Sequence, residues 1–368
     1  MSASGVHTSD VAASEVAASE ASTSYRARAL PDAVMAVPTV RYEQLRGLPC
    51  ALAGATMGTT WSARLALPAG VDEAMARRAI QSALDDVVAQ MSHWEEATAI
   101  TRYNRAAMGW QALPTGMLDV LDCGLEVARL TDGAYDPTIG ALVQAWGFGP
   151  HQRAYEPPTA AALDAARARG GWQRVRRGGD HAWQDGGVLL DFSSIAKGYG
   201  VDCAARALQA LGVADFLMEA GGELRAQGLR PDGLPWRVAI EWPDGGGHAD
   251  YVVLDRQAIA TSGDYRRYFQ HAGKRHSHTL DPRSGQPVDN GVASVTVLHA
   301  SCMQADAWAT ALTVLGAEAG LRMANAQGLA ALFVIRGEHG LEPRASHAFV
   351  ASRTAQYADR GQAVSAPR

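Results

Sequence analysis

The sequence predicts an α+β protein built as one layered domain. Helical and strand patterns follow one another along the chain, but they neither alternate strictly nor collect in separate halves, which favours an α+β layered fold over a doubly wound one. With 368 residues, of which 47% are hydrophobic and 19% charged, the chain can bury a large core. Its 38 glycines are many for a helical bundle and indicate frequent turns or close contact between backbone and a ligand.

In the first half of the chain, apolar periodicity predicts one strand followed by three helices. Residues 61–67 largely alternate between apolar and polar side chains, as a half-buried strand does. Residues 72–91 carry an apolar side chain at every fourth position, which is typical of an amphipathic helix. A second helix is expected over 115–130, with Gly133 just past its end, and a third over 159–169.

The second half is expected to hold most of the strands. Residues 188–192 are expected to form a strand that leads into a helix over 194–211, which Gly212 ends. A helix over 305–315, a further helix and a buried strand over 329–335 follow. The remaining expected strands cover residues 216–218, 236–242, 251–254, 258–261 and 294–299.

Both ends of the chain are expected to lie outside the folded domain. The N-terminal stretch is rich in Ala and Ser and repeats Val-Ala-Ala-Ser-Glu at 11–15 and 16–20. Such a composition cannot bury enough apolar surface to offset the entropy lost on ordering. We therefore expect a disordered segment over 1–45, one domain over 46–350 and a loose tail over 351–368.

Charge and cysteine usage argue against several function classes. The formal net charge is −5, and no Lys/Arg run is long enough for a nucleic-acid footprint, so no nucleic-acid partner is expected. The four cysteines lie far apart without a C-x-x-C pair, which argues against a structural zinc site. The apolar run at 329–335 is too short to span a bilayer, so no membrane span is expected.

The segment Asp191-Phe-Ser-Ser-Ile-Ala-Lys197-Gly-Tyr is the first candidate for chemistry. It joins the expected strand to the expected helix, where backbone N–H groups and the helix dipole favour an anion. Lys197 adds a point charge suited to phosphate, although the Walker spacing is absent. From the residues alone, an anion site and a capped helix with a solvated Lys197 both stay open.

Asp306 and Thr310 form the second candidate. Four residues apart on an expected helix, they share one face and offer a carboxylate and a hydroxyl side by side. Mg²⁺ prefers such hard oxygen atoms. The same pattern also fits a surface aspartate with a threonine bonded back to its own helix.

A histidine pair is the third candidate. Strand alternation places His276 and His278 on the same side, and a histidine there could act as a general base near neutral pH. The turn residues that follow, Asp281-Pro-Arg-Ser-Gly285, fit a plain hairpin equally well.

Taken together and in order, the sequence clusters resemble the FAD:protein FMN transferases, the ApbE family. The similarity covers residues 52–337, with small departures at Phe192 and Thr279. The clusters that carry it are Met57-Gly-Thr-Thr, Met91-Ser-His-Trp94, Gly133-Ala-Tyr-Asp-Pro-Thr, Trp146-Gly-Phe-Gly, the segment from Asp191 to Tyr199, Gly221-Gly222, Thr261-Ser-Gly-Asp-Tyr, residues 278–285 and Ala305-Asp-Ala-Trp-Ala-Thr.

The resemblance implies a T-fold-related α+β domain that uses FAD and Mg²⁺ and moves FMN onto a Thr or Ser hydroxyl of an acceptor protein, with release of AMP. By matching position, His278 would be the catalytic base. The residues implied to contact FAD are Met57, Trp94, Ala134, Tyr135, Asp136, Asp191, Lys197 and Leu280. The residues implied to surround the metal are Ser194, Asp306, Ala309 and Thr310.

Two other functions stay open at this point. An FAD pyrophosphatase would use the same site with water in place of the acceptor hydroxyl. A non-catalytic flavin-binding module would not need Asp306, Thr310 or His278, so their joint presence argues against it. No export signal is seen, and a cytoplasmic location is expected, with a periplasmic or inner-membrane-associated one as the alternative that the resemblance suggests.

Overall fold

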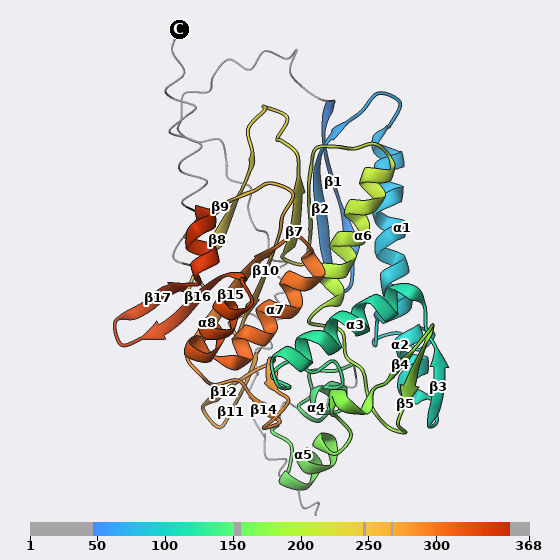
Figure 1. Cartoon of the computed structure of the whole chain (residues 1–368), viewed down its shortest axis with the longest axis vertical. Coiled ribbons are helices and arrows are strands. Elements are labelled where there is room, and N and C mark those ends of the chain that lie inside the picture. The colour runs from blue at the N-terminus through green and yellow to red at the C-terminus, as the bar shows by residue number, and fades with distance from the viewer. Residues whose placement is uncertain (1–46, 151–155, 246–247, 266–267, 354–368) are drawn as a thin grey trace, which may run out of the picture.

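A central sheet of eight strands organises the fold (Figure 1). The computed structural model describes residues 47–150, 156–245, 248–265 and 268–353, so the expected N-terminal segment and most of the expected tail lie outside the described residues. In the order in which they pair, the strands are β1 (Leu48–Thr56), β2 (Thr59–Leu67), β6 (Phe216–Ala220), β7 (Glu223–Gln227), β10 (Ala258–Gly263), β15 (Val292–His299), β16 (Ala330–Gly337) and β17 (Gly340–Ala345).

The α+β class is confirmed, but the expectation of mixed sheets is wrong for the described residues. Neighbouring strands of the central sheet pair antiparallel throughout. Parallel pairing among the described residues is limited to one isolated bridge, between Ile139 and Leu189.

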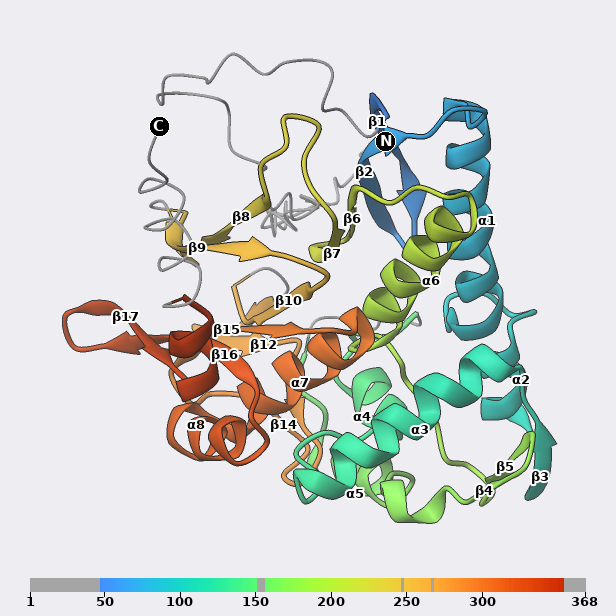
Figure 2. The ribbon, with the colours of Figure 1, turned by 45° about the horizontal axis from the view of Figure 1, so that its top comes forward.

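Helices cover one face of the sheet (Figures 1 and 2). The long ones are α1 (Glu73–Met91), α3 (Thr115–Leu130), α6 (Ala196–Ala210), α7 (Cys302–Leu315) and α8 (Ala317–Ala326). The shorter ones are α2 (Ala99–Arg105), α4 (Gly140–Ala145) and α5 (Ala160–Arg167). Helix α6 packs on β6 and β7, and α7 packs on β10 and β15 and against α6 and α3.

A hairpin of β8 (Trp236–Glu241) and β9 (His248–Leu254) covers the opposite face of the sheet. Successive side chains of a strand point to opposite faces. Accordingly, Phe216 and Met218 lie in the core under the helices, whereas Leu217 lies in the core under the hairpin. The central strands of the sheet are therefore buried on both sides, whereas β1 and β2 expose alternate residues.

Three small sheets complete the described fold. One joins β3 (Gly109–Ala112), β5 (His181–Gln184) and β4 (Arg177–Gly178) in that order. The other two are the hairpins β11 (Tyr268–His271) with β12 (Lys274–Ser277), and β13 (Leu280–Asp281) with β14 (Gln286–Pro287).

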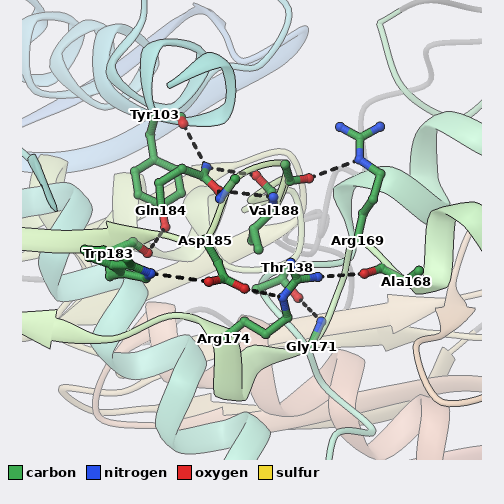
Figure 3. A network of polar contacts seen from close by, with 12 residues as sticks. Tyr103, Thr138, Ala168, Arg169, Gly171, Arg174, Trp183, Gln184, Asp185 and Val188 are labelled. Carbon is green, nitrogen blue, oxygen red and sulfur yellow. Dashed lines mark hydrogen bonds and ion pairs between the residues drawn. The ribbon is translucent and has the colours of Figure 1, made fainter. Parts of the chain in front are cut away.

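The expected strand over 188–192 is absent. The backbone of Pro137 and Gly140 bonds one edge of this segment, and side-chain amides bond the other. Gln184 accepts from the N–H of Val188 at 3.1 Å and donates to its carbonyl at 3.0 Å (Figure 3). Asn104 does the same for Leu190, at 2.8 and 2.9 Å. Because the backbone polar groups are satisfied in this way, an apolar run can be buried without joining a sheet.

The expected helix starts also shift. Residues 193–195 form a turn, so α6 begins at Ala196 rather than at 194. Helix α7 begins at Cys302, three residues before the expected start, because Ser301 caps it and Asp202 accepts from its first N–H groups. In the part of the chain that the structure describes, no helix combines the length and apolar character that crossing a bilayer requires.

Candidate active site at the crossing of two helices

Helices α6 and α7 meet at a close crossing formed by Gly198 and Asp306. A Cβ atom at Gly198 would lie 2.3 Å from the carbonyl oxygen of Cys302, so glycine alone permits this approach. The Gly198 N–H donates to Oδ2 of Asp306 at 3.0 Å. Burial raises the pKa of Asp306, which is 4% exposed, while the charge of Lys197 and the Gly198 N–H oppose the rise. A buried carboxylate thus lies against the first turn of α6.

Lys197, the neighbour of Gly198, forms an ion pair with Glu223 at the start of β7. Oε2 of Glu223 is buried and has no hydrogen-bond partner among the described residues. Burial raises the pKa of Glu223 to about 7; Lys197 opposes that rise and Asp306 adds to it. Burial would lower the pKa of Lys197, but Glu223 and Asp306 outweigh it and raise this pKa. Lys197 is therefore a paired cation beside two buried carboxyl groups, not a freely solvated one.

The turn before α6 brings three sequence clusters together. Oδ1 of Asp191 accepts from the N–H of Ser193 at 2.8 Å, and its Oδ2 lies 3.9 Å from Nε2 of His93. The Ser194 hydroxyl donates to the phenolic oxygen of Tyr135 at 3.1 Å. Ile195 provides no side-chain cap for the helix. Of the first three N–H groups of α6, that of Ala196 donates to the Phe192 carbonyl and that of Gly198 to Asp306, which leaves that of Lys197 among the described residues.

Two of the expected flavin contacts, Met57 and Trp94, lie in two separate turns. Met57 and Gly58 link β1 to β2 with φ angles of 48° and 70°, as a two-residue type I′ turn requires. The Met57 side chain packs on α6, since a Cβ at Gly200 would lie 2.6 Å from its Cε. Trp94 is 51% exposed, and its ring lies 5.8 Å from that of His93.

A pocket of about 460 Å³ lies beside Asp136. Oδ1 of Asp136 accepts from the N–H and the hydroxyl of Thr138 at 2.8 and 2.7 Å, and Oδ2 accepts from the N–H of Trp172 at 3.1 Å. Thr138 in turn accepts from the N–H of Gly171 at 2.7 Å (Figure 3). Burial raises the pKa of Asp136, and these hydrogen bonds oppose the rise. Asp136 therefore holds together the loops that line the pocket.

The two histidines of the third candidate reach one aromatic cluster, as the strand alternation predicts. The ring of His276 stacks on Phe269 at 4.9 Å and lies 5.5 Å from Trp146. His278 follows the end of β12, and its ring meets Phe148 edge-on at 6.4 Å. His276 is buried, and burial lowers its pKa, with Lys274 and His271 adding to that effect and Asp289 opposing it. His278 is partly exposed.

The segment after His278 leads back to the pocket. Leu280 is buried in the same aromatic cluster. Nε1 of Trp146 donates to the carbonyl oxygen of Gly285 at 2.8 Å. Arg283 lines the pocket together with Asp136 and is held by two hydrogen bonds of 2.9 Å to Asp281. The pocket thus joins the histidine segment to the loop that contains Asp136.

Oxygen atoms along α7 provide donors for a cation next to this crossing. Thr310 lies one turn beyond Asp306, and its Oγ1 is 2.8 Å from Oγ of Ser262. The carbonyl oxygen of Ala309 accepts from the Thr313 hydroxyl at 2.8 Å. Carboxylate, hydroxyl and carbonyl oxygens are hard donors that suit Mg²⁺. Among the described residues, no group of three or more His, Cys, Asp or Glu is placed to hold a metal, so a cation here would also need phosphate or water oxygens.

The structure places most of the expected residues in two neighbouring groups, and Trp94, Ala134 and Asp136 lie outside both. The first group, which lies around the crossing of α6 and α7, is connected by hydrogen bonds and packing. The second group consists of His278 and Leu280 and lies in the aromatic cluster. Ala134 is buried next to Tyr135, and Asp136 lines the pocket that borders the second group. The first group comprises Met57, Tyr135, Asp191, Ser194, Lys197, Asp306, Ala309 and Thr310.

Two residues at the site were missed from the sequence, Glu223 and Ser262. Glu223 directly follows the Gly221-Gly222 pair, and Ser262 lies inside Thr261-Ser-Gly-Asp-Tyr, so both stood in or beside clusters already noted. The sequence around Glu223 and Ser262 does not indicate their partners, because Lys197 and Thr310 lie 26 and 48 residues away on other elements.

Comparison with known proteins identifies the family of the chain. The model of the ApbE family matches residues 57–333, which is more than half of the chain. The chain belongs to the ApbE family. A protein of Vibrio cholerae named FAD:protein FMN transferase is 40% identical over 303 residues, which cover 81% of this chain and 91% of that relative. A protein of the same name from Escherichia coli K12 is 35% identical over 297 residues, covering 77% and 84%.

Solved structures of the ApbE family have the same fold. The apo form of the Pseudomonas stutzeri flavinyl transferase ApbE matches with a TM-score of 0.77 at 39% identity, over 82% of this chain and 96% of that one. The flavin transferase ApbE from Vibrio cholerae matches with a TM-score of 0.78 at 38% identity, over 82% and 98%. The antiparallel sheet and its helical cover are therefore those of the family.

Proposed function

We propose that this protein is an FAD:protein FMN transferase, which transfers FMN from FAD to a Thr or Ser hydroxyl of an acceptor protein and releases AMP. The observation that carries the proposal is the crossing of α6 and α7, where the ammonium of Lys197 lies beside the buried carboxyl of Asp306 at the first turn of a helix. Cation, helix N-terminus and hard oxygen donors are what a pyrophosphate substrate needs.

FAD is expected to bind across the two groups of residues. Its pyrophosphate would lie at the turn before α6, where the ammonium and the backbone N–H of Lys197 and the dipole of the helix offer positive charge. Its other parts would contact the surrounding residues. These are Met57, Trp94, Ala134, Tyr135, Asp136, Asp191 and Leu280.

The donor set also fits Mg²⁺, which Asp306 and Thr310 would hold with Ser194 and the carbonyl of Ala309. When bound, the ion would neutralise part of the negative charge on the pyrophosphate. Asp306 is suited to this role because it is a buried carboxyl whose pKa is raised by burial, so a nearby cation stabilises its charged form.

The group transfer itself exchanges the phosphoanhydride bond of FAD for a phosphoester bond to the acceptor. The acceptor hydroxyl oxygen attacks the flavin-side phosphorus, a P–O bond forms, and the bond from that phosphorus to the oxygen of AMP breaks. His278 takes the proton of the hydroxyl, since an alcohol is a weak nucleophile at neutral pH without a base. His278 suits this role better than His276, because it is partly exposed, whereas His276 is buried in the aromatic stack.

The experiment incubates the protein with FAD, Mg²⁺ and an acceptor domain that carries an Asp-Gly-Ala-Thr segment. We expect a flavin-fluorescent acceptor band that survives denaturing electrophoresis. The matched control is the same acceptor with the Thr of that segment replaced by Ala, which should stay dark. Release of FMN and AMP at the same rate with either acceptor would instead identify an FAD pyrophosphatase.

A further inference from the structure

Thr310 differs from Thr313, the other threonine of α7, in the partner of its hydroxyl group. Thr313, on the same helix, donates to the carbonyl of Ala309 four residues earlier, at 2.8 Å. This back-bond is the common state of a helical threonine. The Thr310 hydroxyl instead lies 2.8 Å from Oγ of Ser262, on β10.

The position of Ser262 on β10 aims it at α7. Ala260 belongs to the core under the helices and Ile259 to the core under the β8–β9 hairpin. By alternation, Ser262 faces the helices, whereas Thr261 faces the hairpin. Thr261 forms its own hydroxyl pair there, at 2.9 Å from Thr296 of β15.

We propose that Ser262 is a positioning residue that orients the Thr310 hydroxyl toward the Mg²⁺ site. A hydroxyl oxygen that binds a cation directs a lone pair at it, so its proton must point away and needs an acceptor. Ser262 supplies that acceptor from a neighbouring strand. The inference rests on the proposed function, because the cation site belongs to it.

Removing Ser262 should release Thr310 to the back-bond that Thr313 already makes. The Thr310 hydroxyl would then direct its proton at the carbonyl of Asp306, four residues earlier, and its lone pairs would turn with it. The carboxylate of Asp306 would remain in place, because its hydrogen bond comes from Gly198 and not from Ser262. The expected defect is weaker cation binding with an intact fold.

The test measures the Mg²⁺ concentration that gives the half-maximal shift of the thermal midpoint of FAD-saturated protein, without acceptor. Ser262→Ala should need roughly 3- to 10-fold more Mg²⁺, the fold-change that corresponds to one hydrogen bond. Ser262→Thr should restore the wild-type value, since it keeps the hydroxyl. Thr261→Val, which removes the hydroxyl pair on the opposite face of the same strand, should match wild type. FAD affinity in EDTA should be the same in all four proteins.

A wild-type Mg²⁺ requirement in Ser262→Ala would overturn the inference, as would an equal defect in Thr261→Val, which would show a general loosening of β10. Failure of the proposed function has a different signature. A wild-type protein without any Mg²⁺-dependent shift would overturn the cation site itself, and Ser262 with it. A normal shift that is lost in Asp306→Asn but kept in Ser262→Ala would overturn the role of Ser262 alone.

Discussion

Lys197 of α6 and Glu223 of β7 form an ion pair in which the carboxylate is almost fully buried and the lysine partly so. One carboxylate oxygen of Glu223 has no hydrogen-bond partner among the described residues. A Lys197 that binds phosphate must therefore do so next to a buried negative charge. The pair fixes the ammonium at the crossing of the helices before any substrate arrives.

The first prediction concerns Lys197→Ala. Loss of a charge-assisted contact to phosphate should weaken FAD binding by roughly 1.5–3 kcal/mol, while riboflavin, which lacks the pyrophosphate, should bind as to wild type. Titration of intrinsic fluorescence with both ligands measures this. Equal FAD affinity in the two proteins would remove Lys197 from the binding site.

The ion pair adds a second expectation for the same residue. Lys197→Ala leaves the Glu223 carboxylate buried without its cation, and breaking such a pair typically costs about 3 kcal/mol of stability. Adding Glu223→Gln to Lys197→Ala should recover most of that loss in urea unfolding. FAD affinity should remain low in the double variant, which separates the binding role of Lys197 from its role in stability.

The pH dependence of stability provides a third prediction. The pKa of Glu223 is raised from its ordinary value of 4.5 to about 7, so the folded protein binds more protons than the unfolded chain between these values. The contribution of Glu223 to stability is therefore largest at low pH and falls as the pH rises toward 7. Compared with Glu223→Gln, the unfolding free energy of metal-free wild type should decline between about pH 5 and about pH 7, by at most ~1.4 kcal/mol per pH unit. Parallel curves for the two proteins would contradict it.

The fourth prediction concerns Asp306, which accepts a hydrogen bond from Gly198 and is proposed to bind the metal. Asp306→Asn keeps an oxygen that can accept from the Gly198 N–H, so the protein should fold normally but lose Mg²⁺-dependent transfer. Asp306→Ala should lose transfer and also roughly 1–3 kcal/mol of stability, because that buried N–H is left unsatisfied. Normal transfer by Asp306→Asn across a Mg²⁺ titration would show that Asp306 is structural only.

The fifth prediction separates the two histidines. His278→Ala should keep its FAD affinity and thermal midpoint but lose about 10²–10⁴-fold in transfer rate, the usual contribution of a general base. His276→Ala should instead lower the thermal midpoint and leave the transfer rate of the folded protein largely unchanged, since it removes a buried ring stacked on Phe269. A loss of rate in His278→Ala that unfolding fully explains would assign His278 to packing.

Much of the fold is predictable from local pattern, and the structure shows why. Helix α1 is recognisable because its buried residues recur every three to four positions and Asp72 caps its start. Residues 188–192 have the composition of a strand, but the backbone groups of Val188 and Leu190 are bonded by the side chains of Gln184 and Asn104. The composition of residues 188–192 alone cannot predict these hydrogen bonds from side chains elsewhere in the chain.

The candidate site is predictable for residues whose spacing carries chemistry, and not for their supporting partners. Asp306 and Thr310 stand out because the helical repeat places them on one face. Glu223 and Ser262 act across elements, so their roles depend on how α6 and α7 dock on the sheet. That docking is a property of the assembled core, in which Gly198 permits the close contact of α6 with α7.

The most direct test of the central claim is the ratio of AMP released to flavin bound covalently to the acceptor. FAD is supplied in limiting amount with Mg²⁺, an acceptor domain is in excess, and both products are quantified at completion. A transferase predicts one AMP for each flavinylated acceptor, with negligible free FMN. AMP accompanied by an equal amount of free FMN, with no covalent flavin on the acceptor, would contradict the account.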